Sequence, residues 1–189
     1  MRYRRIRQTG ATYFFTVITG GRRPLFADPR AIAILRNATQ YVRLHHPFFI
    51  EAEVIMPDHI HTLWTLPEHD SDFSKRWMLI KSNFSREYRR NTVSGFASGL
   101  TPTYKNNAMS RPSRGQTSIW QHRFWEHLIR DERDFSAHVE YIHFNPVKHG
   151  LAKSAIDWPH STFKQFVDRG EYAVSWGTSD MPPLPEWAG

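Results

Sequence analysis

Hydrophobic residues recur in short blocks along the first part of this chain, and their spacing changes from one block to the next. Residues 12–19 (TYFFTVIT) are β-branched or aromatic and are followed by two glycines, which predicts a strand. Asp28 and Pro29 are typical of a helix start, with the acid as cap and proline at the first helical position. Apolar residues then keep helical spacing until Pro47, so this stretch is predicted to be a helix.

Two more strands and a second helix follow. Residues 48–56 and 59–66 alternate between apolar and polar positions, and the turn residues Pro57 and Asp58 separate them, which predicts two paired strands. A helix is predicted from about Ser71, because the next apolar residues form a stripe at helical spacing: Phe73, Trp77, Ile80, Phe84 and Tyr88.

The regular spacing of apolar residues is lost in the middle of the chain and then returns. Residues 91–118 are rich in Ser, Gly, Asn, Thr and Pro without apolar periodicity, which predicts a long loop that either contacts nucleic acid or is an inert insertion. Residues 119–129 are again strand-like and rich in aromatic side chains. Asp131 is a candidate cap for a third helix that is predicted to end near Asn145, because Pro146 disfavours helical geometry in the residue before it.

The order strand, helix, strand, strand, helix, strand, with a further helix behind it, is the split β-α-β pattern of ferredoxin-like α+β domains. An antiparallel sheet with helices on one face is therefore predicted. The domain is expected to span residues 1–150 and to be followed by a C-terminal extension, residues 151–189, that is a further candidate for DNA contact.

Composition and charge limit the classes of function that the chain can have. The chain has 189 residues and no cysteine, which excludes disulfides, thiolate metal sites and cysteine nucleophiles. It has no apolar run long enough for a membrane span and no visible secretory signal, so a cytoplasmic protein is expected. Lys and Arg exceed Asp and Glu by 25 to 18, a net charge of +7, which favours a polyanionic partner and nucleic acid ahead of a membrane.

The third predicted strand carries a pair of candidate metal ligands. His59 and His61 are two residues apart, so in a strand they share one face with about 6.6 Å between them, a spacing that suits one metal ion. Apolar residues such as Ile60 and Trp64 would then face a core. The alternative is that both imidazoles are only exposed or hydrogen-bonded.

The third predicted helix carries a second group. Tyr141 and Asn145 are four residues apart and share one helical face, with His138 one turn before them. A phenol is a poor nucleophile at its ordinary pKa near 10, but a cation beside a scissile phosphate offsets this. The imidazole pair and the Asn145 carbonyl oxygen could together hold such a cation. The alternative interpretation of this segment is core packing next to a helix end.

These residues resemble the REP-associated tyrosine transposases, a branch of the single-tyrosine HUH transposases of bacterial insertion sequences. The histidine-hydrophobic-histidine motif is His59 to His61 in MPDHIHTLWTLPE, and Tyr141 in YIHFNPVKHGL matches the catalytic tyrosine. Further matches are WQHRFWEHLIR from Trp120 and DWPHSTF from Asp157. The likeness covers roughly the first 170 residues, and the combination of motifs is specific although each alone is not.

The resemblance implies a ferredoxin-like HUH nuclease fold and metal-assisted cleavage of single-stranded DNA at repetitive extragenic palindromes (REPs), which fold into hairpins. It implies Tyr141 as nucleophile, forming a 5′-phosphotyrosine and releasing a 3′-hydroxyl, with His59, His61 and Asn145 as ligands of Mg²⁺ or Mn²⁺. A bacterial protein associated with the nucleoid when bound to DNA is then expected. The stretch 91–118 is longer than is usual in the family.

Other residues are candidates for contact with DNA. Basic side chains could neutralise phosphates, and those singled out are Arg2, Arg4, Arg5, Arg7, Arg123 and Lys148. Some aromatic side chains could stack on unpaired bases, although core packing is the preferred explanation for most of them: Trp120, Phe124, Trp125 and Trp158. The general base for Tyr141 is left unassigned.

Two alternatives to the transposase hypothesis stay open. Ferredoxin-like sheets with aromatic faces also bind single-stranded nucleic acid without catalysis, and a metallonuclease could use water in place of the phenol. The sequence also leaves open whether the protein acts as a monomer or as a homodimer, and which nucleotides it recognises.

Overall fold

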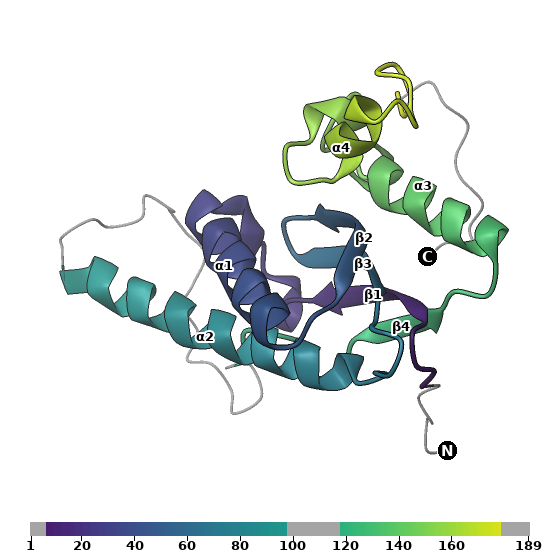
Figure 1. Ribbon diagram of the computed structural model, residues 1–189. Coiled ribbons are helices and arrows are strands. Elements are labelled where there is room, and N and C mark those ends of the chain that lie inside the picture. The colour runs from purple at the N-terminus through teal and green to yellow at the C-terminus, as the bar shows by residue number, and fades with distance from the viewer. Residues whose placement is uncertain (1–6, 98–117, 179–189) are drawn as a thin grey trace.

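A four-stranded antiparallel sheet lies at the centre of the protein (Figure 1). The computed structural model describes residues 7–97 and 118–178. The strand order is β2-β3-β1-β4, and every neighbouring pair is antiparallel, as the ferredoxin-like prediction requires. The strands are β1 (Thr12–Ile18), β2 (Phe49–Ile55), β3 (His59–Thr65) and β4 (Trp125–Leu128).

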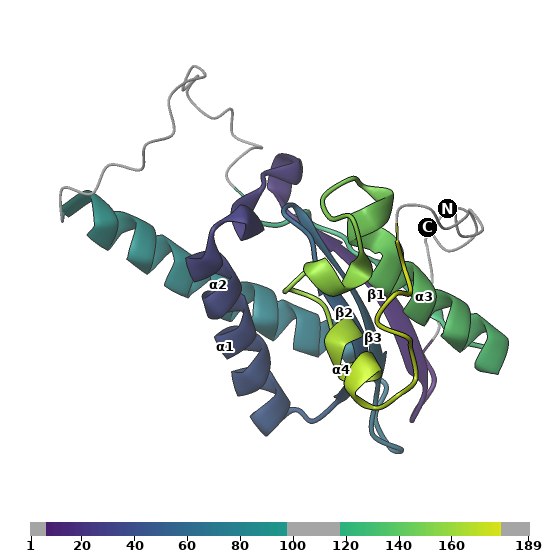
Figure 2. The same ribbon diagram turned by 90° about the horizontal axis from the view of Figure 1, so that it is seen from above.

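Helices cover both faces of this sheet (Figures 1 and 2). Helices α1 (Pro29–His45) and α2 (Phe73–Ala97) pack on one face, whereas α3 (Glu132–Lys148) and α4 (Phe163–Asp168) pack on the other. The expectation of helices on one face alone was therefore wrong, because the helix after the last strand folds back over the opposite side. Within the described ranges, no helix is both long and apolar enough to cross a bilayer.

Strand β1 shows how two cores share one sheet. Tyr13, Phe15 and Val17 point into the core under α1 and α2, where Trp64 stacks on Trp77 with 4.2 Å between ring centroids. Phe14 points the other way, into the core under α3. Successive side chains of a strand alternate between faces, so a strand buried on both sides is apolar almost throughout.

Helix α2 is longer than the sequence predicted. It continues to Ala97, so the predicted loop 91–118 is wrong at its start, and residues 98–117 lie outside the described residues. The Asn91 side chain donates to the Glu87 carbonyl, and the Thr92 hydroxyl donates to the Tyr88 carbonyl. A helix that has already nucleated gains one backbone hydrogen bond for each added residue, so it extends through residues without an apolar stripe.

Helix α3 also extends beyond its predicted end. Pro146 lies inside its last turn, and the helix ends at Lys148. Because Pro146 lies close to the C-terminal end of α3, it removes only one backbone hydrogen bond of the helix. The residues after it close the last turn. Gly150 has φ of 66°, and the Leu151 N–H donates to the Pro146 carbonyl at 2.8 Å, the pattern of a Schellman cap. The strand predicted over 119–129 shrinks to β4.

The segment after α3 returns to the free edge of the sheet. Ser161 forms an isolated bridge with Val54, and the Thr162 N–H donates to the Glu53 carbonyl at 2.9 Å. The Trp158 indole N–H donates to the Ile55 carbonyl. This segment therefore protects strand β2, which is an edge strand of the sheet that the described residues form. The division at residue 150 stays a prediction.

Arg76 connects the start of α2 to the end of α1. Its side chain is 2% exposed and donates to the carbonyls of His46, Pro47 and Asp72 and to the Asp70 carboxylate. We expect Arg76→Met to lower the free energy of unfolding by about 3 kcal/mol, because it leaves these acceptors without their charged donor. Urea unfolding measures this change. The exposed Arg86→Met, on the same helix, should cost under about 0.5 kcal/mol, and equal losses would contradict the assignment.

His143 makes folding stability depend on pH. Burial, and secondarily the Arg169 charge, lowers the pKa of His143 to about 3, so the folded protein holds this ring neutral where the unfolded chain protonates it. The unfolded state then binds more protons between about pH 6.5 and pH 3, and the free energy of unfolding falls as the pH falls through that range.

The expected contribution is up to about 1.4 kcal/mol per pH unit. In His143→Gln, the slope of unfolding free energy against pH should be shallower than in the wild type between about pH 6 and pH 5, and the two slopes should agree above about pH 8. Chemical unfolding at each pH provides the measurement. Parallel curves throughout would show that His143 does not carry this dependence.

Candidate active site

The two histidines of β3 and the tyrosine of α3 meet on one face of the sheet. The His59 and His61 rings lie 4.7 Å apart between centroids, and the Tyr141 ring lies 5.1 Å from the His61 ring. All three side chains are buried. Phe14 of β1 contacts the rings of both His61 and Tyr141. Residues some 80 positions apart in the sequence therefore form one cluster within a single chain.

Each imidazole is oriented through its Nδ1 atom. His59 Nδ1 lies 2.5 Å from a carboxylate oxygen of Asp58, and His61 Nδ1 lies 2.9 Å from the Thr16 hydroxyl. These contacts leave Nε2 of both rings as the atom for a metal, which is the usual arrangement of a metal-binding histidine with an outer hydrogen-bond partner.

Asp58 is itself held as an anion. Burial alone would raise the pKa of its carboxyl group, but the hydrogen bonds and charges of His59 and Arg22 outweigh burial and lower the pKa below its ordinary value. Arg22 Nη1 lies 3.0 Å from this carboxylate. Burial, followed by the positive charges of His59, His149 and Lys148, holds the pKa of His61 well below its ordinary value. A neutral imidazole is the form that binds a metal.

Asn145 supplies the test of whether these residues fit a metal. Asn145 is 0% exposed, and neither its amide oxygen nor its amide nitrogen forms a well-aligned hydrogen bond to a described residue, although the amide lies close enough to the Tyr141 phenol to favour its ionised form. A buried amide without partners is costly, and an oxygen ligand for a divalent cation would remove part of that cost. The donor set of two imidazoles and one amide oxygen fits a divalent metal ion.

Tyr141 is protonated near neutral pH. Its side chain is 7% exposed, and burial raises the pKa of the phenol, an effect that the Asn145 amide only partly offsets. Lys148 Nζ lies 5.0 Å from the centroid of the Tyr141 ring, a place that it reaches because α3 continues past Pro146. The phenol therefore needs activation before it can act as a nucleophile, and cationic groups lie near it.

The other sequence candidates are placed differently. Arg7 is exposed and lies near Asp72, with its guanidinium 3.4 Å from the Ser74 hydroxyl. Arg123 lines a surface groove beside β4. Arg2, Arg4 and Arg5 lie outside the described residues.

Sequence reasoning missed three neighbours of the site. Asp58 was interpreted only as a turn residue, although it directly precedes His59. Thr16 could not be recognised, because the pairing register that places it opposite His61 is not visible in either strand alone. The His149 ring lies 6.0 Å from the His59 ring between centroids, and no spacing in the sequence distinguishes His149 from the other histidines of the chain.

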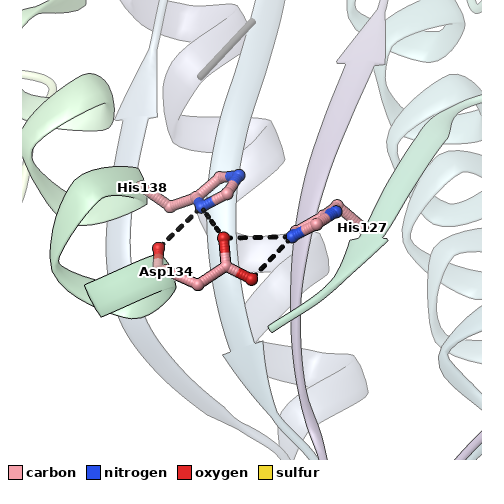
Figure 3. A group of neighbouring side chains, drawn as sticks. All are labelled: His127, Asp134 and His138. Atoms are coloured by element: carbon pink, nitrogen blue, oxygen red, sulfur yellow. Dashed lines mark hydrogen bonds and ion pairs between the residues drawn. The ribbon is translucent and has the colours of Figure 1, made fainter. Parts of the chain in front are cut away.

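A second group of potential metal ligands lies between β4 and α3, apart from His59 and His61. His127 of β4 and Asp134 and His138 of α3 place their ligand atoms within 4.8 Å of one another (Figure 3). Asp134 already bonds to both rings: its carboxylate lies 2.8 Å from His127 Nε2 and 3.2 Å from His138 Nδ1. These three residues could hold a metal, and as they stand they form a hydrogen-bonded connection between β4 and α3.

Comparison with known proteins decides the family. An Escherichia coli K12 protein named REP-associated tyrosine transposase is 43% identical to this chain over 174 residues, 92% of this chain and 89% of that protein. The chain belongs to the REP-associated tyrosine transposases. A Haemophilus influenzae protein assigned to the same family is 37% identical over 175 residues, covering 93% of this chain and 92% of its own. No protein-family model matches the chain.

A solved structure supports the same assignment. A REP-associated tyrosine transposase bound to a REP hairpin superposes with a TM-score of 0.73 at 40% identity, covering 98% of this chain and 97% of that chain. The fold prediction and the resemblance seen in the sequence are thereby confirmed, and so is the prediction that this REP-associated tyrosine transposase is an enzyme.

Proposed function

We propose that this chain cleaves and rejoins single-stranded DNA at REP hairpins through a 5′-phosphotyrosine on Tyr141. The observation that carries the proposal is the contact between the His61 and Tyr141 rings, 5.1 Å apart between centroids in one chain. A phosphate held at the histidine pair would lie within reach of the phenolic oxygen. The hairpin in the related solved structure supports the choice of substrate.

The covalent step exchanges one phosphodiester for another. The bond from the Tyr141 oxygen to phosphorus forms while the bond from phosphorus to the 3′ oxygen breaks. The proton that the phenol loses balances the proton that the released 3′-hydroxyl gains. Because the new ester keeps the energy of the old one, attack by another 3′-hydroxyl reverses the step and joins strands without an external energy source.

His59, His61 and Asn145 would hold the divalent cation, Mg²⁺ or Mn²⁺. When bound, it would stabilise negative charge on the phosphate oxygens as they react. The protein's own contribution is orientation: Asp58 and Thr16 hold the two imidazoles through Nδ1, and Phe14 packs beneath them. The orphaned amide of Asn145 supports its assignment as third ligand.

The positive charge of the chain favours binding of the phosphates of a DNA backbone. The chain has a net charge of +7, and Lys148 lies beside the nucleophile, where it would neutralise a phosphate. Since the histidines and the tyrosine come from the same chain, one protomer would suffice for cleavage. A monomer is the simplest active form under this proposal.

We expect Tyr141→Phe to abolish covalent attachment to DNA while leaving hairpin binding largely unchanged, because only the attacking oxygen is removed. The measurement incubates labelled single-stranded REP hairpin with Mn²⁺ and looks for a protein-DNA band that survives denaturation. Tyr41→Phe, an exposed tyrosine on α1, is the matched control and should keep the band.

The same gel distinguishes the rival functions. Free cleaved ends without an attached protein would indicate a metallonuclease that uses water. Binding without any cleavage would indicate a non-catalytic single-strand-binding protein. A persistent adduct in Tyr141→Phe would show that another residue is the nucleophile.

Asp58→Asn tests the support of the metal ligands. We expect Mn²⁺ affinity to fall about 10- to 100-fold, because His59 loses the carboxylate that orients its ring. Titration followed by electron paramagnetic resonance measures free Mn²⁺ directly. The control is Asp168→Asn, an exposed carboxylate paired with Lys164, which should leave affinity unchanged. An unchanged affinity in Asp58→Asn would remove Asp58 from the site.

A further inference from the structure

Trp125 is a large exposed side chain close to the proposed active site. It is 46% exposed, although it begins strand β4. Thr16 of β1 pairs with His61 on one side and with Trp125 on the other, so these three residues form one row across the sheet. Directly paired residues share a face, and neighbouring strands lie about 4.8 Å apart. The indole therefore lies on the face of the histidines, two strands away.

A stack of rings holds the indole in place. Trp125 stacks on His127 with 5.9 Å between centroids and 6° between planes, and His127 stacks on His138 at 4.8 Å. Asp134 bonds to both of these imidazoles, as Figure 3 shows. The edge of the stack also meets Phe14, which lies 5.6 Å from the Trp125 ring.

This packing gives the indole a fixed position relative to the reacting groups. Phe14 contacts Trp125, His61 and Tyr141 at once. An exposed aromatic ring that is held rigid loses little entropy when a flat ligand stacks on it, and its apolar face gains from being covered. The cluster of His127, Asp134 and His138 therefore serves to support the Trp125 ring.

A surface groove adjoins the indole, and its exposed charged residue is Arg123. It has a volume of about 300 Å³, and its lining residues are Thr16, Ile18, Gln121, Arg123, Phe124, Trp125 and Glu126, of which Glu126 is buried. Arg123 is exposed at this groove, so its guanidinium can meet a backbone phosphate. An apolar ring face next to a cationic side chain is the combination that binds single-stranded nucleic acid.

We propose that Trp125 is a stacking platform for one unpaired base of the DNA strand next to the cleaved phosphate, with Arg123 on the adjoining phosphate. This inference rests on the proposed function and adds a base-binding subsite to it. A base inside a duplex has both faces covered by its neighbours, so the platform takes a single-stranded flank and not the hairpin stem. It thereby places the scissile phosphate relative to Tyr141.

The test measures binding in the Tyr141→Phe background, so that cleavage does not interfere. The probes are a REP hairpin with a single-stranded flank and the same hairpin with a blunt stem. Trp125→Ala should weaken binding of the flanked hairpin about tenfold or more, whereas the blunt hairpin should bind as before. Trp125→Phe keeps a stacking ring and should recover most of the affinity. Tyr41→Ala removes an exposed aromatic ring from α1, on the opposite face, and should change neither.

A spectroscopic readout identifies the stacked base. The fluorescent base 2-aminopurine, placed at each flank position in turn, should be quenched on binding at one position, and Trp125→Ala should restore its fluorescence. The affinity for the flanked probe should depend less on salt in Arg123→Gln. The plot of log affinity against log salt concentration should become shallower by about 0.7, the value for the loss of one phosphate contact on a single strand.

Two results would overturn the proposal. One is flanked-hairpin affinity in Trp125→Ala equal to that of its parent. The other is an equal loss for flanked and blunt probes with normal thermal unfolding, which would assign Trp125 to the stem. Both are independent of the covalent-adduct assay, so a failure of this inference differs from a failure of the proposed chemistry.

Discussion

The packing of α3 across the sheet is the constraint on which the rest of the structure depends. Val139, Ile142 and Phe14 form its apolar core together with residues of β2 and β3, and this core brings Tyr141 to His61. The proposed nucleophile is thus placed by hydrophobic burial, which has no directional preference, whereas hydrogen bonds, which are directional, adjust the residues around it. Without this core the imidazole pair would be an ordinary polar feature of an exposed sheet face.

The site concentrates polar groups where burial makes them costly. His61, Asn145 and Tyr141 are all nearly inaccessible, and burial shifts the pKa values of His61 and Tyr141 toward their neutral forms. The clearest example is the Asn145 amide, because burying it without a well-aligned hydrogen bond lowers the stability of the folded state. Such costs persist in proteins where the groups have a chemical use, and the apolar core beneath α1 and α2 supplies stability that balances them.

Much of the fold followed from local patterns. The alternation in β3, the Asp28 cap of α1 and the order of elements predicted the ferredoxin-like sheet, and the Asp28 side chain does accept the Arg30 N–H. The ends of α2 and α3 did not follow, because helix propagation and a C-terminal cap outweighed local signals at Asn91 and Pro146. The coverage of the second sheet face depends on where the chain turns back, which no spacing in the sequence encodes.

The same division holds for the site. His59, His61, Tyr141 and Asn145 were identified from spacing within one element and from family resemblance. Thr16 could not be recognised, because its position opposite His61 depends on strand register, a relation between elements distant in sequence. Trp125 was one of four aromatic candidates for base stacking, and only its exposure and its pairing with Thr16 single it out.

The continuation of α3 through Pro146 has a consequence for how reaction and folding are linked. Tyr141 and Asn145 lie on the last turns before a proline, a glycine in the left-handed region and a Schellman cap, so the helix end beneath them has few ways to fray. Fraying would swing the phenol away from the His61 ring and would admit water to the phosphotyrosine that the proposed mechanism forms. Under the proposed mechanism, a firmly closed helix end would guard the covalent protein-DNA ester against premature hydrolysis.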